Sequence, residues 1–368
     1  MVIQNLTNCT GCGVCVSVCP KKCLDLKLNK LGFYTPVLNS NECNNCGFCT
    51  TVCPKDSKIL DHEILKVSAV NTNDKEQLFT SSSGGICYEL AKAELLLGKK
   101  VCAVVYDYEK NIAKHAEITD INQLEQTKGS KYFQSYSSEA FAAVLNGDEW
   151  VVFGSPCQIA GLAVAAEKKK IRDKLLLVDF FCHGTPSVNL WKKYLLQNNS
   201  KPIQKINFRS KEKGWREFSI LFNYNDGTTF SDSGKNLFYE LFFSNTCLNG
   251  ACYNCNFKAL KSFADIRVGD LWGEKYKENK EGVSGVIAFT NKGHVALSAL
   301  SNACNIVDES QDVVLQGQMF ISPKKPFCNK KILRALSKNK SLKYIYNVTL
   351  FQFRLKSKLK SVFRGFFK

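Results

Sequence analysis

Two short segments near the N-terminus repeat one spacing of cysteines. Residues 9–20 (CTGCGVCVSVCP) and 43–54 (CNNCGFCTTVCP) both follow C-x2-C-x2-C-x3-C-P, lie 34 residues apart and are identical at seven of twelve positions. In this pattern three closely spaced cysteines bind one 4Fe-4S cluster, while the fourth, beside the proline, binds the other cluster. The spacing therefore predicts two clusters with crossed ligands. One set is Cys9, Cys12, Cys15 and Cys53, and the other is Cys43, Cys46, Cys49 and Cys19.

Zinc is the alternative metal for a cysteine-rich segment, and it fits this one poorly. Zinc sites use paired C-x2-C knuckles with four ligands, whereas eight cysteines share the pattern here. Gly13 and Gly47 lie inside the loops, where backbone must approach the inorganic sulfides closely. Cys23 fits no ligand position and is expected to be a packing residue. We interpret residues 1–60 as an α+β, bacterial-type dicluster ferredoxin domain.

The 18 cysteines of this 368-residue chain also bear on its location. Disulfide scaffolds with so many cysteines are short secreted chains. This sequence shows neither the basic and apolar regions of a secretory signal nor a run of 18 apolar residues. We therefore expect reduced, metal-binding cysteines and a cytoplasmic location.

The net charge of +17 is concentrated near the C-terminus. Residues 313–368 contain 14 Lys or Arg and no Asp or Glu, which leaves 36 basic against 33 acidic residues before them. Each oxidised 4Fe-4S core with four thiolates contributes about −2, so the first 312 residues would be nearly neutral. Nucleic-acid binding requires a basic face on the folded body, so we predict no nucleic-acid partner.

Beyond residue 60 the sequence alternates apolar strands with helices. Buried strands are expected at 101–108, 149–154, 174–181 and 284–289, each followed or preceded by a helical segment behind a Ser-, Thr- or Gly-rich turn. Residues 206–230 have the pattern of a β-hairpin. Alternating strands and helices predict an α/β domain over residues 61–322 with a mixed or mostly parallel sheet.

Four further cysteines occur in positions that suit metal binding. Cys157 and Cys182 each follow a predicted strand, and in an open α/β sheet such strand ends face the ligand crevice. The helix that begins at Cys157 also favours a thiolate. With Cys252 and Cys255 they predict a third 4Fe-4S cluster, for which Cys247 is the reserve ligand, or else a redox dithiol between Cys157 and Cys182. The other cysteines are expected to pack as small apolar side chains: Cys87, Cys102, Cys304 and Cys328.

Several blocks of residues 1–322, in order, resemble the coenzyme F-420 hydrogenase/dehydrogenase beta-subunit family. They are SSSGGICYELA, GSKYF, VVFGSPCQIAGL, LLLVDFFCHGTPSVNLWKKYL, INFRSKEKGW, ACYNC, ADIRVGDLWG and GVSGVIAFTNKG. The resemblance implies a family N-terminal part over about 61–145 and a C-terminal part over about 146–322. It also implies a flavin, FAD or FMN, that passes electrons between iron–sulfur clusters and a two-electron acceptor. Family members include deazaflavin-reducing subunits and reductases of chlorophyll-type pigments, so the family does not fix the acceptor.

The matching blocks supply candidates for flavin contacts. Ser83, Gly84 and Gly85 precede a helix whose N–H groups can meet a flavin phosphate, or they are a plain helix start. Lys131 and Lys213 either neutralise a phosphate or reduced flavin or are solvated surface lysines. Asp270 and Trp272 resemble the family's cofactor-facing loop. His183 is either a proton donor or a hydrogen-bonded core histidine.

The resemblance implies an iron–sulfur flavoprotein oxidoreductase that acts on a deazaflavin or another organic substrate. The alternative is an electron-transfer subunit of a hydrogenase- or dehydrogenase-type complex, with catalysis on another polypeptide. The expected partners are a redox protein or a small redox carrier, together with a small-molecule substrate.

The resemblance does not account for residues 323–368, which we interpret as a basic amphipathic tail. On a helical wheel one face carries apolar side chains and the rest carries Lys and Arg, which is typical of helices on anionic membranes. We predict peripheral contact with the inner face of the membrane through residues 349–368; the alternative is a helix docked on the protein's own body or on an acidic partner subunit. The apolar face comprises Phe351, Leu355, Leu359, Val362, Phe363 and Phe366.

Overall fold

The computed structural model describes residues 8–57, 63–198, 201–232, 236–349 and 351. Its N-terminal region contains an antiparallel pair of strands, β1 (Leu24–Leu28) and β2 (Tyr34–Leu38). The one-turn helices α1 (Val14–Ser17) and α2 (Phe48–Thr51) begin directly after Gly13 and Gly47, whose φ angles are 84° and 73°. Glycine adopts this left-handed conformation without steric cost, so it is the residue that starts each turn. A 3-10 turn, η1 (Pro54–Asp56), follows the second motif.

The main domain is built on a nine-stranded mixed sheet in the order β14-β3-β13-β12-β8-β7-β4-β5-β6. The four middle strands, from β12 to β4, are parallel, whereas β13, β3 and β14 pair antiparallel at one side. The strands are β3 (Lys66–Thr72), β4 (Lys100–Asp107), β5 (Ile112–Ile118), β6 (Ser135–Tyr136), β7 (Trp150–Phe153), β8 (Leu175–Phe180), β12 (Ile266–Asp270), β13 (Ser284–Ala288) and β14 (Cys304–Asp308).

Helices cover both faces of this sheet because alternate residues of its central strands are apolar and point to opposite sides. Val101 and Ala103 of β4 pack with α4 (Ile86–Leu96) and α9 (Asn291–Ser298), while Cys102 packs with α5 (Ser138–Val144) and α6 (Pro156–Lys168). The remaining elements here are α3 (Lys75–Thr80), η2 (Ile121–Thr127), η3 (Arg172–Lys174), η5 (Glu274–Tyr276) and α10 (Gln311–Leu315).

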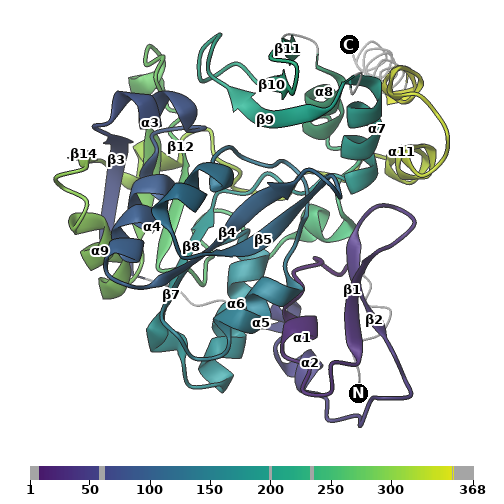
Figure 1. The fold of residues 1–368 in the computed structure, drawn as a ribbon, viewed down its shortest axis with the longest axis horizontal. Helices are drawn as coiled ribbons and strands as arrows, with labels where there is room; N and C mark the ends of the chain where they lie inside the picture. Colours follow the sequence, from purple (N-terminus) through teal and green to yellow (C-terminus); the bar gives the residue numbers. More distant parts are fainter. Residues whose placement is uncertain (1–7, 58–62, 199–200, 233–235, 350, 352–368) are drawn as a thin grey trace, which may run out of the picture.

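A second, antiparallel sheet lies at the top of Figure 1 and comprises β9 (Ile203–Ser210), β10 (Ser219–Tyr224) and β11 (Thr229–Asp232). It shares an aromatic core with α7 (Val188–Asn198) and α8 (Leu237–Phe243). The same core includes Ile332 and Leu333 of α11 (Asn329–Leu336), and Leu342 and Ile345 beyond it. Residues 328–349 therefore pack on the body of the protein. Residues 350 and 352–368 lie outside the described part of the chain, and with them most of the predicted membrane helix.

The N-terminal region packs against the main domain through α1. Val14 of α1 and Val18, its C-cap, share a core with Phe141 of α5 and Ile159 of α6, and these three helices lie next to one another in Figure 1. Among the described residues, no helix has the length and apolar character needed to cross a bilayer. The predicted fold class, an α/β main domain with a small ferredoxin-like region and a mixed sheet, is confirmed.

Candidate functional site

The structure brings the first set of predicted cluster ligands around one cavity. Cys9, Cys12, Cys15 and Cys53 all line it, with Gly11 and Gly13 between them. The Gly11 amide donates to the Cys9 sulfur at 3.3 Å, and a Cβ at Gly11 would lie 2.5 Å from the Tyr34 carbonyl oxygen. Cys53 comes from the second motif, so its position beside the first three cysteines agrees with crossed ligation. Four thiols around one space suit a 4Fe-4S cluster.

The second set is arranged more openly. Cys19 lies with its sulfur 3.4 Å from that of Cys23, and Cys23 also interacts with Cys43. Cys49 is close enough to Cys15 to influence its pKa, whereas Cys46 is exposed. Cys23 is buried, as a packing residue should be. Its thiol nevertheless lies directly against two predicted ligands, a contact that the spacing of the motifs does not reveal.

The third set occupies the edge of the sheet where parallel strands end. Cys157 lies in the first turn of α6, shortly after β7, and Cys182 follows β8. Cys252 and Cys255 come from the 3-10 turn η4 (Gly250–Asn254) and the residue after it. All four thiols interact electrostatically with one another, so the structure does bring the third set together. Cys247 instead lies in the aromatic core, where its thiol meets the Leu241 carbonyl.

Burial dominates the acid–base behaviour of the third set. It raises the pKa of the Cys157 thiol to about 12 and raises those of Cys182 and Cys252 as well. The Thr185 amide compensates in part for Cys252, because it donates to that sulfur at 3.3 Å. The Phe257 amide donates to the Cys255 sulfur at 3.4 Å. A metal core deprotonates its thiols outright, and such N–H donors stabilise the thiolates. The described residues contain no group of Cys, His, Asp or Glu with single-ion geometry.

A buried cation adjoins the third set. Lys258 is 7% exposed, and its ammonium donates to the carbonyls of Cys182 at 2.5 Å and His183 at 3.1 Å. Its charge opposes the effect of burial on the pKa of the Cys182 thiol. A cluster with four thiolates carries net negative charge, so Lys258 is placed to stabilise it. The sequence blocks gave no reason to single out this lysine.

An ion pair between two neighbouring strands stabilises the segment next to Lys258. Arg267 of β12 faces Asp179 of β8 in the sheet register, and the two side chains meet through bonds of 2.7 and 2.6 Å. Arg267 also donates to the carbonyls of Ala259 and Lys261, and Ser262 donates to Asp179. This network fixes the loop that directly follows Lys258.

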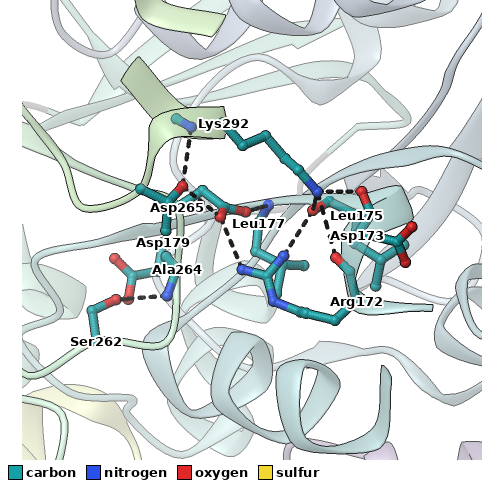
Figure 2. A network of polar contacts seen from close by, with 11 residues as sticks. Arg172, Asp173, Leu175, Leu177, Asp179, Ser262, Ala264, Asp265 and Lys292 are labelled. Carbon is teal, nitrogen blue, oxygen red and sulfur yellow. Dashed lines mark hydrogen bonds and ion pairs between the residues drawn. The ribbon is translucent and has the colours of Figure 1, made fainter. Parts of the chain in front are cut away.

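A second network, around Asp265, holds the start of β12 (Figure 2). Its carboxylate accepts from Arg172, from the Leu177 amide at 2.8 Å and from Thr290. Lys292 reaches the carbonyls of the turn before β8 from the other side. Asp265 belongs to the matching block ADIRVGDLWG, and its contacts here are structural.

Cys12 connects the first cysteine set with the third. Its thiol interacts with Cys157, and Cys157 with Thr10 of the first motif. Gly161 of α6 makes this approach feasible, because a Cβ there would lie 2.9 Å from Val14 and 3.6 Å from the Cys12 sulfur. The loop is held by Gln134, which donates to the Thr10 carbonyl, and by Ser137, which donates to that of Cys12.

A cavity of about 710 Å³ opens directly beyond the third set. Cys12, Cys157 and Cys182 form part of its wall. Its volume lies within the range of small-molecule and cofactor sites. The wall combines serine hydroxyls with aromatic rings, a lining that suits a flavin's phosphate and ring system. The predicted flavin residues that line it are Ser83, Gly85, Lys131, Asp270 and Trp272, and His183 lines it too.

Gly84 and Lys213 do not line the cavity. A Cβ at Gly84 would lie 2.1 Å from the Val70 carbonyl and 2.7 Å from the Ser284 amide, so this glycine allows its loop to cross the β3–β13 pair. A larger residue there would damage the fold before it affected a cofactor. Gly85, at φ 83°, is the N-cap of α4. Lys213 is exposed.

Lys131 lines the cavity but holds its own loop. Its ammonium lies within hydrogen-bond distance of four carbonyls, including those of Val104 and Thr127 at 2.9 Å, and burial lowers its pKa to about 7. Lys211 likewise holds the loop of Ser81, Ser82 and Ser83, which we call the serine loop. It donates at 2.6 Å to the carbonyls of Leu78, Ser83 and Glu281. These lysines give shape and positive potential to the site. The sequence blocks suggested Lys213 where Lys211 is the residue in contact.

Asp270 and Trp272 meet an arginine that the sequence reading did not select. Arg209, 2% exposed, pairs with Asp270 at 2.6 Å and lies over the rings of Phe218 and Trp272. Trp272 stacks on Trp215 with ring centroids 5.2 Å apart. His183 bonds to Asn245 at 2.7 Å, and burial lowers its pKa. Arg209 lies in the block INFRSKEKGW, and its place in that block is the signal by which the sequence could have indicated it.

Comparisons with known proteins agree with this arrangement. Residues 8–57 match a model of the 4Fe-4S dicluster domain, and residues 147–312 match one that describes the C terminus of the coenzyme F420 hydrogenase/dehydrogenase beta subunit. No curated protein matches the chain. Its fold is similar to a chain in a xenon-derivatised structure of the F420-reducing [NiFe] hydrogenase complex from Methanosarcina barkeri. The TM-score is 0.50 at 15% identity, over 81% of this chain and 94% of that one. Residues 147–312 of this chain therefore match the C-terminal part of the coenzyme F420 hydrogenase/dehydrogenase beta-subunit family, and residues 8–57 match a 4Fe-4S dicluster domain.

Proposed function

We propose that this protein is an iron–sulfur flavoprotein oxidoreductase that exchanges electrons between 4Fe-4S clusters and a two-electron organic partner. A bound flavin supplies the link, because it takes up hydride and also exchanges single electrons with clusters. The observation that carries the proposal is the shared wall of the 710 Å³ cavity. Three cysteines of the first and third sets line it together with five of the seven candidate flavin residues.

The order of the cysteine sets supports a path for electrons through the chain. The second set adjoins the first through Cys49 and Cys15, and the first adjoins the third through Cys12 and Cys157. The third set borders the cavity. Lys258, Lys211 and Arg209 place positive charge along the last part of this path, where reduction adds negative charge.

The organic substrate shares this cavity or its opening. His183, Phe218, Phe242 and Phe243 also line the cavity, and their rings pack against one another. Aromatic rings favour a planar ligand, which suits a deazaflavin or another conjugated molecule. The chemistry of the wall does not single out one member of that class.

The second candidate is an electron-transfer subunit that serves a catalytic partner protein. The similar chain from a hydrogenase complex favours it. Both candidates require the same clusters and flavin, and they differ in whether the isolated chain reduces an organic substrate.

A flavin titration tests the proposal. Cys87 lines the cavity from the first turn of α4 and is exposed, so Cys87→Trp should fill the cavity without disturbing the core. Leu96→Trp, at the far end of the same helix and 69% exposed, is the matched control. We expect wild type and Leu96→Trp to bind one flavin, measured by fluorescence quenching, and Cys87→Trp to bind it at least about tenfold more weakly. Wild-type protein that carries no flavin and binds none on titration would contradict the proposal.

A further inference from the structure

Residues 318–328 form an exposed surface that combines apolar and basic side chains. Phe320, Ile321 and Phe327 are 48%, 78% and 66% exposed, and Lys324 and Lys325 are exposed beside them. We call these five residues the docking patch. Large apolar side chains gathered on one exposed segment mark an interaction site more often than isolated ones do.

The docking patch borders a groove rather than a flat surface. A hollow of about 560 Å³ lies between residues 318–328 and the turn at Ser244 and Asn245. Such a concave, partly apolar surface suits a convex protein with an apolar centre.

This groove lies immediately outside the third cysteine set. The Cys255 amide donates to the Ser322 hydroxyl at 2.9 Å, and Lys325 lies 5.8 Å from the Tyr253 ring centroid. On the opposite wall, Asn245 bonds to His183, the neighbour of Cys182. The groove and the third set thus lie on opposite sides of the chain segments that contain Cys182 and Cys255.

Charge identifies the kind of partner. Residues 313–368 contain no Asp or Glu. Within the described part of that segment every Lys and Arg is exposed. These are Lys324, Lys325, Lys330, Lys331, Arg334, Lys338, Lys340 and Lys343. Lys324 and Lys325 place this positive charge beside the apolar side chains of the docking patch, and such a combination attracts an acidic protein, speeds their encounter and fixes their orientation.

We propose that the docking patch binds an acidic one-electron carrier protein and admits its electrons to the third cysteine set. This inference rests on the proposed function, because it requires a cluster at that set. In each encounter the carrier loses one electron and this chain gains one, and no bond is made or broken. Two encounters supply two electrons. Together with one proton from solvent they make up the hydride that the organic partner takes up.

The test uses the full, cluster-loaded chain and a reduced acidic [2Fe–2S] ferredoxin as the probe. Stopped-flow absorbance follows oxidation of the ferredoxin under anaerobic conditions. We expect Lys324→Glu/Lys325→Glu to lower the second-order rate constant at least about tenfold at low ionic strength. Lys338→Glu/Lys340→Glu makes the same charge change away from the groove and should lower it less than about twofold. The wild-type rate constant should also fall as NaCl is added.

Three results would overturn the inference. They are an unchanged rate constant for Lys324→Glu/Lys325→Glu, equal losses in both variants, and binding of wild type to anionic liposomes that this variant alone abolishes. The last would assign the patch to a membrane. Dithionite, a small donor, separates this inference from the proposed function. If it reduces the clusters of wild type while ferredoxin does not, only the docking inference fails. If it reduces no third cluster, the proposed function fails.

Discussion

Replacing Arg267 by methionine should destabilise the protein strongly, because it leaves a buried carboxylate without its cation. The side chains of Arg267 and Asp179 are 1% and 0% exposed, and two hydrogen bonds of 2.6 and 2.7 Å join them. After the change Asp179 keeps the Ser262 hydroxyl as its side-chain donor among the described residues, and the carbonyls of Ala259 and Lys261 lose the Arg267 donor. Removing one partner of such a buried pair costs about 3–5 kcal/mol.

The double variant Asp179→Leu/Arg267→Met separates the pair from the simple loss of a side chain. Replacing a buried ion pair by apolar residues is often neutral or stabilising, so the double variant should recover most of the lost stability. The assay is urea unfolding, followed by far-UV circular dichroism on anaerobically prepared samples of equal iron content. Lys201→Met, which breaks an exposed ion pair with Asp226, should leave the midpoint unchanged. A loss below about 1 kcal/mol for Arg267→Met, or a double variant as unstable as the single one, would refute the reasoning.

Three further predictions concern the clusters and the C-terminal segment. Cys19→Ser/Cys53→Ser should lower the iron content and the EPR signals of both N-terminal clusters, because each residue serves the opposite motif; loss of one cluster alone would contradict the crossed assignment. Lys258→Met should shift the reduction equilibrium of the third cluster at least about tenfold toward the oxidised form, ~59 mV in an EPR-monitored titration, whereas exposed Lys261→Met should not. The full chain should sediment with anionic liposomes at low salt, and a chain ending at residue 348 should not; equal sedimentation would exclude a membrane role for residues 349–368.

The spacing of the cysteines predicted much of the site because metal ligation constrains short-range sequence. The position of Cys53 beside Cys9 and Cys15 agrees with the crossed pattern, and the ends of β7 and β8 place Cys157 beside Cys182. The positions of β4, β7, β8 and β13 followed equally well from local apolar runs. The antiparallel pairing of β3 with β13 and β14 did not, because these segments are distant in the sequence and their pairing leaves no local signal.

Contacts that depend on tertiary packing were the hardest to anticipate. Lys211 and Lys213 are two residues apart and chemically identical, yet only the fold decides which one turns inward to the serine loop. Gly84 looked like a cofactor glycine, whereas it serves the crossing of two segments far apart in the sequence. Residues 328–349 looked like part of a basic tail because they carry six Lys or Arg and no acidic residue, although apolar side chains such as Ile332 and Ile345 anchor them in the core.

The central claim is that three clusters and a flavin share one chain, and cofactor analysis of the anaerobically purified protein tests it most directly. Iron, acid-labile sulfide and released flavin would be measured against protein determined by amino-acid analysis. The arrangement of the three cysteine sets predicts about twelve irons and one flavin per chain. A reproducible content of about eight irons with no flavin would contradict the account.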